Sequence, residues 1–424
     1  MKPLLFRRLF ISGTFSCAFM FSAPVFSQDL TDLLKDAVDN DPWIQSSNWQ
    51  QKALTQQGLA STQWMDPKLS VSLGNLATDS FDFNQEAMTQ LNVSLMQMLP
   101  NKNKLHLSEK VFIEQANLQP LLRDQRIAQI SLEIKKLWIE AFHAHASIAL
   151  IKDNYQWFEQ MIDLSKNNYQ SGYKFSDSQN ILEAELELLK MDDKLLILKN
   201  KQNLMLAKLS QYLNKPIDLA NSQWPTDHNI IKIDTNQFIS EAVNAHPSMQ
   251  ILNQRIVILE NEKSLSSTTD DLNWTVGAGY AYRADADNGM KRSDLLSISV
   301  SVNVPYFSKN KANLKVESKS SMIQALMFEK QTLANQLTTQ YQSILAQWEN
   351  NAERLKLNQN QSLEKSTEFS DVALNSYTTN SNDFSKVLKA KIIELNTKLT
   401  LLELTSDQHN LIAQYQYINT GTSK

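Results

Sequence analysis

The chain has 424 residues, a formal net charge of −4 at pH 7, and only eight glycines and one cysteine. This acidic balance excludes the basic surface on which nucleic-acid binding depends. The scarcity of cysteine excludes a fold held together by disulfides.

The first 27 residues have the pattern of an export signal. Three cations are followed by the apolar run LFISGTFSCAFMF, and the sequence VFS at 25–27 is typical of a cleavage site. We therefore predict a signal peptide over 1–27 and a mature chain that starts near Gln28. Cys17 would leave with the signal, so the mature chain would contain no thiol for a disulfide, a metal site or a nucleophile.

After the signal, no segment reaches the ~18 consecutive apolar residues that a membrane-spanning helix needs. Any crossing of a membrane would therefore have to be made by strands, because helices and closed sheets are the structures that satisfy their backbone groups in lipid.

The mature chain repeats one plan. The sequence AVDNDP at 37–42 returns as AVNAHP at 242–247, an offset of 205, and Lys104 returns as Lys311 with an offset of 207. A nearly constant offset indicates an internal duplication. The predicted repeats are 28–234 and 235–424.

Each repeat is expected to contain two strands, one very long helix, a turn and a second helix. For the first repeat the predicted ranges are strands at about 67–99, the long helix at about 102–171 and the second helix at about 178–213. For the second repeat they are strands at about 273–305, the long helix at about 308–379 and the second helix at about 382–418.

The strands alternate strictly between apolar and polar residues. In LLSISVSVNV, Leu296, Ile298 and Val300 would face one way and the serines between them the other. The length and the aromatic ends of NWTVGAGYAY suit a membrane strand, although a soluble sandwich shows the same alternation. Four strands cannot close a barrel with a wet interior. Either they form a soluble ribbon, or several chains share one barrel.

The helices favour a shared structure. Apolar residues from Ile181 to Leu209 recur at spacings of three and four, which is the seam of a coiled coil. The remaining faces carry Asn, Gln, Lys and Glu. This composition suits a thin helical wall with water on both sides.

These features resemble the TolC family of outer-membrane efflux proteins. The residues that carry the resemblance are SVNVPYFSKNKANLK, its echo SLMQMLPNKNKLHL, and the duplicated plan, which together cover essentially all of the mature chain. The segment DPKLSVSLGNLATDSFDFNQEAMTQL is similar to the branch that serves heavy-metal pumps of the resistance-nodulation-division class. The resemblance implies a mainly α fold with a small β part: a trimeric α-helical tunnel below a shared transmembrane β-barrel with four strands per chain.

The resemblance also implies a function. The protein would be a passive exit duct in the outer membrane of a Gram-negative bacterium, with a long periplasmic part, and would export heavy-metal cations. It would contact outer-membrane lipid, a periplasmic adaptor and an inner-membrane resistance-nodulation-division pump, and would need no enzyme activity, cofactor or nucleic acid. One alternative is a duct for organic drugs or for polypeptides of type I secretion. Another is a soluble periplasmic coiled-coil adaptor.

The turns at the far ends of the helices match the family's periplasmic tips, where an adaptor docks and the entrance lies. Candidate docking residues are Ser171, Gly172, Tyr173, Asn380 and Ser381. Candidate entrance or gating residues are Asp383, Lys386 and Lys389. The alternative reading of the two lysines is that they pair with glutamates of the neighbouring helix, such as Glu183, Glu185 or Glu187.

Met96 and Met98 are weak candidates for a metal site. They share the predicted polar strand face with Asn92 and Ser94, and thioethers suit Cu(I). Two thioethers alone make a poor site, so the alternative is that both methionines fill the junction between barrel and tunnel.

Overall fold

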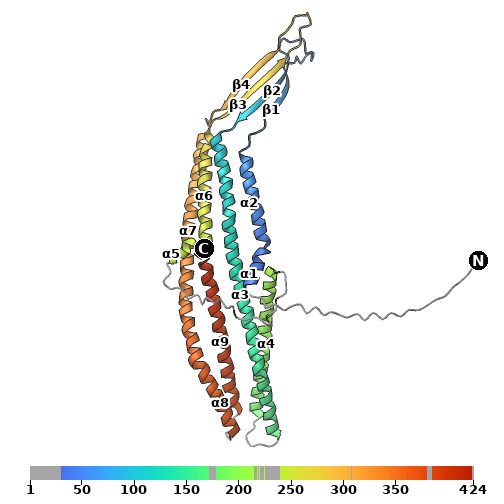
Figure 1. Ribbon diagram of the computed structural model, residues 1–424. Helices are drawn as coiled ribbons and strands as arrows, with labels where there is room; N and C mark the ends of the chain where they lie inside the picture. The colour runs from blue at the N-terminus through green and yellow to red at the C-terminus, as the bar shows by residue number, and fades with distance from the viewer. Residues whose placement is uncertain are drawn as a thin grey trace, which may run out of the picture.

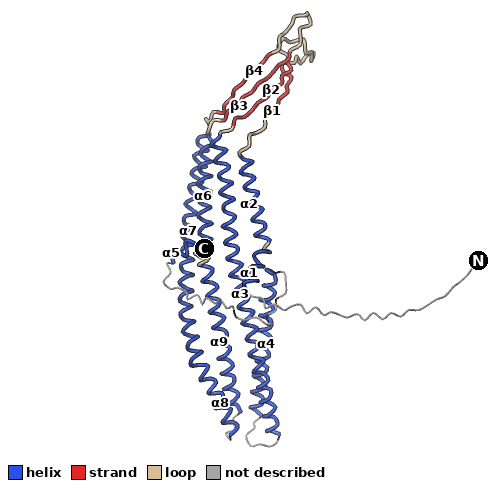
Figure 2. Tube along the Cα trace, viewed as in Figure 1, coloured by secondary structure: helices blue, strands red, loops and turns tan. Residues whose placement is uncertain are grey.

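The computed structural model is an elongated, mainly helical molecule with one small sheet at its end (Figures 1 and 2). It describes residues 30–170, 178–213, 239–306, 308–379 and 384–422, together with Ile217, Leu219 and Trp224. The predicted fold class, mainly α with four strands, is confirmed. The predicted signal peptide lies outside the described residues.

The helices and strands follow the same order in the two halves of the chain. The first half contains α1 (Leu30–Asp39), α2 (Pro42–Ser61), β1 (Lys68–Gly74), β2 (Gln90–Leu99), α3 (Lys102–Gln170) and α4 (Ser178–Leu213). The second half contains α5 (Ile239–Ala245), α6 (Pro247–Ser267), β3 (Asn273–Tyr282), β4 (Leu295–Asn303), α7 (Ser308–Leu357), α8 (Leu363–Thr379) and α9 (Phe384–Ile418).

The long helices form a single layer. Next to the sheet, α2, α3, α6 and α7 lie side by side, and in the other half the order is α4, α3, α9 and then α7 with α8 (Figure 1). The 69 residues of α3 extend about 100 Å at 1.5 Å per residue. No helix within the described ranges has an apolar stretch long enough to span a membrane.

The core of this layer lies between neighbouring helices. One cluster joins Phe158 of α3, Met191 of α4 and Leu388 of α9, and another places Leu33 of α1 against Trp138 of α3. Between α7 and α8 the helix continues through a π-helical turn, Asn358–Ser362, which the sequence pattern did not indicate.

The four strands form one antiparallel sheet in the order β1-β2-β3-β4. Directly paired residues lie on the same face, so the register decides which side chains gather together. Val71 pairs with Val93, Val93 pairs with Tyr280, and Tyr280 pairs with Leu296. The large apolar side chains of all four strands are thereby collected on one face.

Helices α2 and α6 occupy corresponding places in the two halves, and each begins at a proline that follows a residue whose side chain caps the helix. Asp41 caps α2 by accepting a hydrogen bond from the Trp43 amide at 2.7 Å, and it also pairs with Arg126 at 2.7 Å. At the corresponding point of α6, His246 Nδ1 accepts from the Ser248 amide at 3.2 Å. His246 is buried, its Nε2 has no hydrogen-bond partner, and burial lowers its pKa to about 4.

We predict that His246 makes stability depend on pH. Between pH 6.5 and about 4 the unfolded chain binds a proton that the folded chain does not, so the thermal unfolding midpoint should fall as the pH drops through this range. His246→Asn keeps a capping acceptor but cannot be protonated, so it should flatten this dependence. An equal pH dependence in the wild type and the variant would contradict the assignment.

Candidate functional site

One face of the sheet is apolar and exposed. Ile298 is 82% exposed and Leu296 is 76% exposed, far above what an apolar side chain has in a protein core. The larger apolar members of this face are Leu69, Val71, Leu73, Leu91, Val93, Leu95, Leu99, Trp274, Val276, Tyr280, Tyr282, Leu296, Ile298, Val300 and Val302. An exposed apolar patch of this extent marks a contact with a partner or a membrane.

The other face of the sheet is polar and tightly built. Serine, asparagine and glycine predominate, and a Cβ at Gly277 would lie 2.7 Å from the Ser299 hydroxyl, so a larger residue there would force the Ser299 side chain to move. Met96 and Met98 lie on this face, as the alternation predicted, and Met96 is paired with Lys68 and Gly277. Among the described residues, no group of three or more His, Cys, Asp or Glu side chains could hold a metal ion.

The candidate docking residues and the entrance candidate Asp383 lie outside the described residues. The docking candidates concerned are Ser171, Gly172, Tyr173, Asn380 and Ser381. The chain is described up to Gln170 and Thr379 on one side of these turns, and from Ser178 and Phe384 on the other. Phe384 is buried, and its ring centroid lies 6.2 Å from that of Tyr377.

The two candidate entrance lysines lie on exposed positions of the first turns of α9. The Lys389 ammonium is 3.7 Å from a carboxylate oxygen of Glu183 on α4, and the Ser385 hydroxyl donates to the same carboxylate at 3.1 Å. Lys389 therefore has the glutamate partner that the alternative reading expected. The Lys389 side chain is 63% exposed, so this ion pair contributes little stability.

A buried carboxylate between α8 and α9 was missed in the sequence. Glu394 is 4% exposed, and it accepts hydrogen bonds from Lys391 at 2.8 Å and Lys398 at 2.6 Å. Burial alone would raise the pKa of this carboxyl, but hydrogen bonds from the two lysines and from Ser370 prevail and lower it to about 2. The sequence did contain an indication of these ion pairs, because Lys391 lies three residues before Glu394 and Lys398 lies four residues after it.

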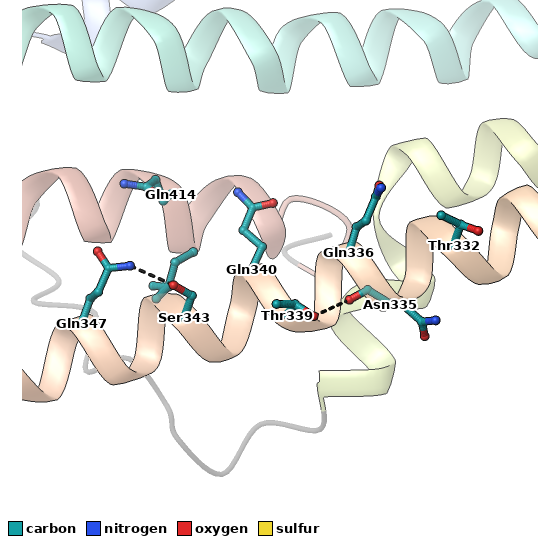
Figure 3. A pocket seen from close by; sticks show the side chains of 9 residues that line it. Thr332, Asn335, Gln336, Thr339, Gln340, Ser343, Gln347 and Gln414 are labelled. Carbon is teal, nitrogen blue, oxygen red and sulfur yellow. Dashed lines mark hydrogen bonds between the residues drawn. The ribbon is translucent and has the colours of Figure 1, made fainter.

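A polar groove runs along α7 and α9. Its first hollow is lined mainly by amide and hydroxyl side chains, among them Gln336, Gln340 and Gln414, and these project away from the backbone of α7 and α9 (Figure 3). A second hollow continues it and contains Arg354 and Asp407. The groove therefore combines hydrogen-bonding amide groups and one charge of each sign with the apolar surface of the same side chains and of Ile344.

The groove and the short helices lie on opposite faces of the helical layer. Leu345 packs in the cluster around Ala242 of α5, and it is two residues from Ser343 in the groove, a rotation of about 200°. On α9, His409 stacks on Trp224 with ring centroids 5.3 Å apart, and Asp407 is again two residues away. One face of the wall thus carries α5 and Trp224, and the groove lies on the other.

Comparisons with solved structures give clear matches, whereas neither a protein-family model nor a curated protein matches the chain. The chain is similar to CusC, described in a study of transmembrane channel formation, with a TM-score of 0.74, 12% identity and 92% of each chain covered. The Vibrio cholerae outer membrane protein VceC gives 0.73 and 14% identity, over 92% of this chain and 96% of that one. The open-state MtrE outer membrane channel of Neisseria gonorrhoeae gives 0.69 and 12%, over 92% and 88%. The chain has the fold of these outer-membrane channels.

Glu394 supplies a prediction for this part of the molecule. Glu394→Gln removes the charge that Lys391 and Lys398 share in a buried position, so it should lower the free energy of unfolding by about 2 kcal/mol. The matched control is Glu368→Gln, whose pair with Lys365 is exposed and should contribute much less to stability. Urea unfolding followed by helical circular dichroism measures both, and equal losses would contradict the role of Glu394.

Proposed function

We propose that the protein is a passive exit duct of the outer membrane. The exposed apolar face of the sheet carries this proposal, because its alternation sets large apolar side chains against a polar face, as in strands that separate lipid from water. Trp274 and Tyr282 lie at the two ends of β3, where aromatic side chains suit the membrane interfaces. The fold shared with outer-membrane channels supports the same conclusion.

We propose that three chains assemble into the duct. The sheet has two edge strands, β1 and β4, whose outer backbone groups need partners in lipid, and pairing β1 of one copy with β4 of the next would provide them. The helical wall offers matching support. Leu182, Leu186 and Leu189 of α4 are each more than half exposed and recur at spacings of four and three, which is a second coiled-coil seam for a neighbouring copy.

The tips at 171–177 and 380–383 are proposed as the docking site of a periplasmic adaptor that connects the duct to an inner-membrane pump. The proposal is supported by the described helices that flank these segments, because the ends of α3, α4, α8 and α9 concerned lie opposite the sheet (Figure 1). Lys386 and Lys389 lie beside them and remain candidates for gating residues. Energy and substrate capture would belong to the partners.

A soluble coiled-coil adaptor is the alternative from another class of protein. This alternative does not account for the exposed apolar face of the sheet, because a soluble sheet buries such a face against a core.

Export of metal cations and export of organic compounds are two versions of the duct proposal. Met96 and Met98 are the residues that the metal version offers as ligands, and both are more than a third exposed.

The first test of the duct introduces charge on each face of one strand. Val300→Asp places a carboxylate on the proposed lipid face at a cost of up to about 2–4 kcal/mol, and it should prevent outer-membrane assembly. The control, Ser301→Asp, places the same group on the polar face of β4 and should assemble. Membrane fractionation and trimer yield are measured, and normal trimer from Val300→Asp would remove the membrane assignment.

The second test concerns the tip. Gly172→Trp places a large side chain in the predicted turn YQSGYKFSD, so it should abolish export while leaving abundance, membrane insertion and trimer intact. Gly172→Ala serves as the size control and should keep most of the export. Full export by the Trp variant would show that this turn does not dock the partner.

A further inference from the structure

The polar face of the sheet carries a single kind of charge. Across the strand residues that the register places on this face, Lys68 of β1 is the one charged side chain, and neither aspartate nor glutamate occurs. Its neighbours are Ser70 on the same strand and Met96 on β2. The wet face of the strands is therefore positive where it is charged at all.

More positive charge lies where α7 begins. A hollow beside the end of α6 is lined by Lys311, Lys315 and Lys319, which are spaced four residues apart and so lie on one side of the helix. Lys319 pairs with Glu262 at 2.5 Å. Lys311 and Lys315 are exposed, and both lie in the first turns of α7.

The lysine hollow and the polar groove lie on the same side of α7. Lys311 and Gln347 are 36 residues apart, which is ten turns of 3.6 residues, so both point the same way from the helix. This is the side opposite Leu345 and α5. In a trimer whose short helices lie outside the tunnel, Lys311 and Lys315 face the interior.

We propose that the junction between sheet and helices selects for anionic solutes, such as organic carboxylates, and disfavours metal cations. The proposal rests on the duct proposed above and names its substrate class. Rings of lysine favour anions in pores as rings of carboxylates favour cations, and three copies would supply three each of Lys68, Lys311 and Lys315. Glu329 is 18 residues, or five turns, from both Lys311 and Gln347, so this exposed carboxylate lies on the same side of α7 and offsets part of the lysine charge. Further along the groove, Asp407 is accompanied by Arg354.

A thiol probe tests the local potential directly. Ser318, which lines the lysine hollow, is replaced by Cys in a chain that carries Cys17→Ser, and its reaction rates with an anionic sulfonate and a cationic trimethylammonium methanethiosulfonate are compared. Both rates are divided by those of a free thiol in solution. Replacing Lys311 and Lys315 by Gln should lower the anionic-to-cationic ratio by about fivefold at 0.1 M salt.

The control thiol lies on the same wet face but far from the hollow. Ser297→Cys, near the other end of β4, should show no change when Lys311 and Lys315 are replaced. An unchanged ratio at Ser318→Cys, or a ratio there below that of the free thiol before the lysines are replaced, would overturn the proposal.

Planar-bilayer recordings test the consequence for transport. In a potassium chloride gradient the wild-type trimer should favour chloride, and Lys68→Glu should move the reversal potential toward potassium, whereas Lys35→Glu on the exposed side of α1 should leave it unchanged. Channels that favour potassium, or whose reversal potential is unchanged by Lys68→Glu, would contradict the anion preference but not the duct. Failure of the wild-type protein to form any channel would remove the duct and this inference together.

Discussion

Strand register is the constraint on which the rest of the structure depends. Each residue of the sheet is paired directly across the strands, so a slip of one position would mix the apolar and polar sets. With the observed register, valine, leucine and aromatic side chains form one continuous exposed face, while serine and glycine form the other. A face of that kind is unfavourable in water, and the proposed contacts with lipid and with further copies at the strand edges would cover it.

The helical layer solves a different problem, because its long helices form a single layer. Its stability comes from seams between neighbouring helices rather than from a central core. Polar groups inside such a wall need partners, and the group formed by Glu394 with Lys391 and Lys398 shows how a buried carboxylate is kept charged. The open face can then remain hydrophilic, with amides and a few charges in contact with water.

The two halves use the same elements with different contacts. Asp41 caps α2 and also forms an ion pair with Arg126. At the corresponding position, His246 caps α6 with a neutral, buried ring. At the top of the wall, Gly58 lies close to Phe112, while the second half has the ion pair between Glu262 and Lys319 at the comparable place. The second half thus has an ion pair where the first half has an apolar contact.

The sequence by itself determined the kinds of element, because alternation with period two and glycine-free runs with heptad spacing are local properties of the chain. It also identified the faces of the strands, and it offered a glutamate of the neighbouring helix as one of two interpretations of Lys389. Tertiary structure decided which helices are neighbours and that Glu394 is buried between α8 and α9. These properties depend on contacts between residues far apart in the chain, and the pattern along a single helix does not contain them.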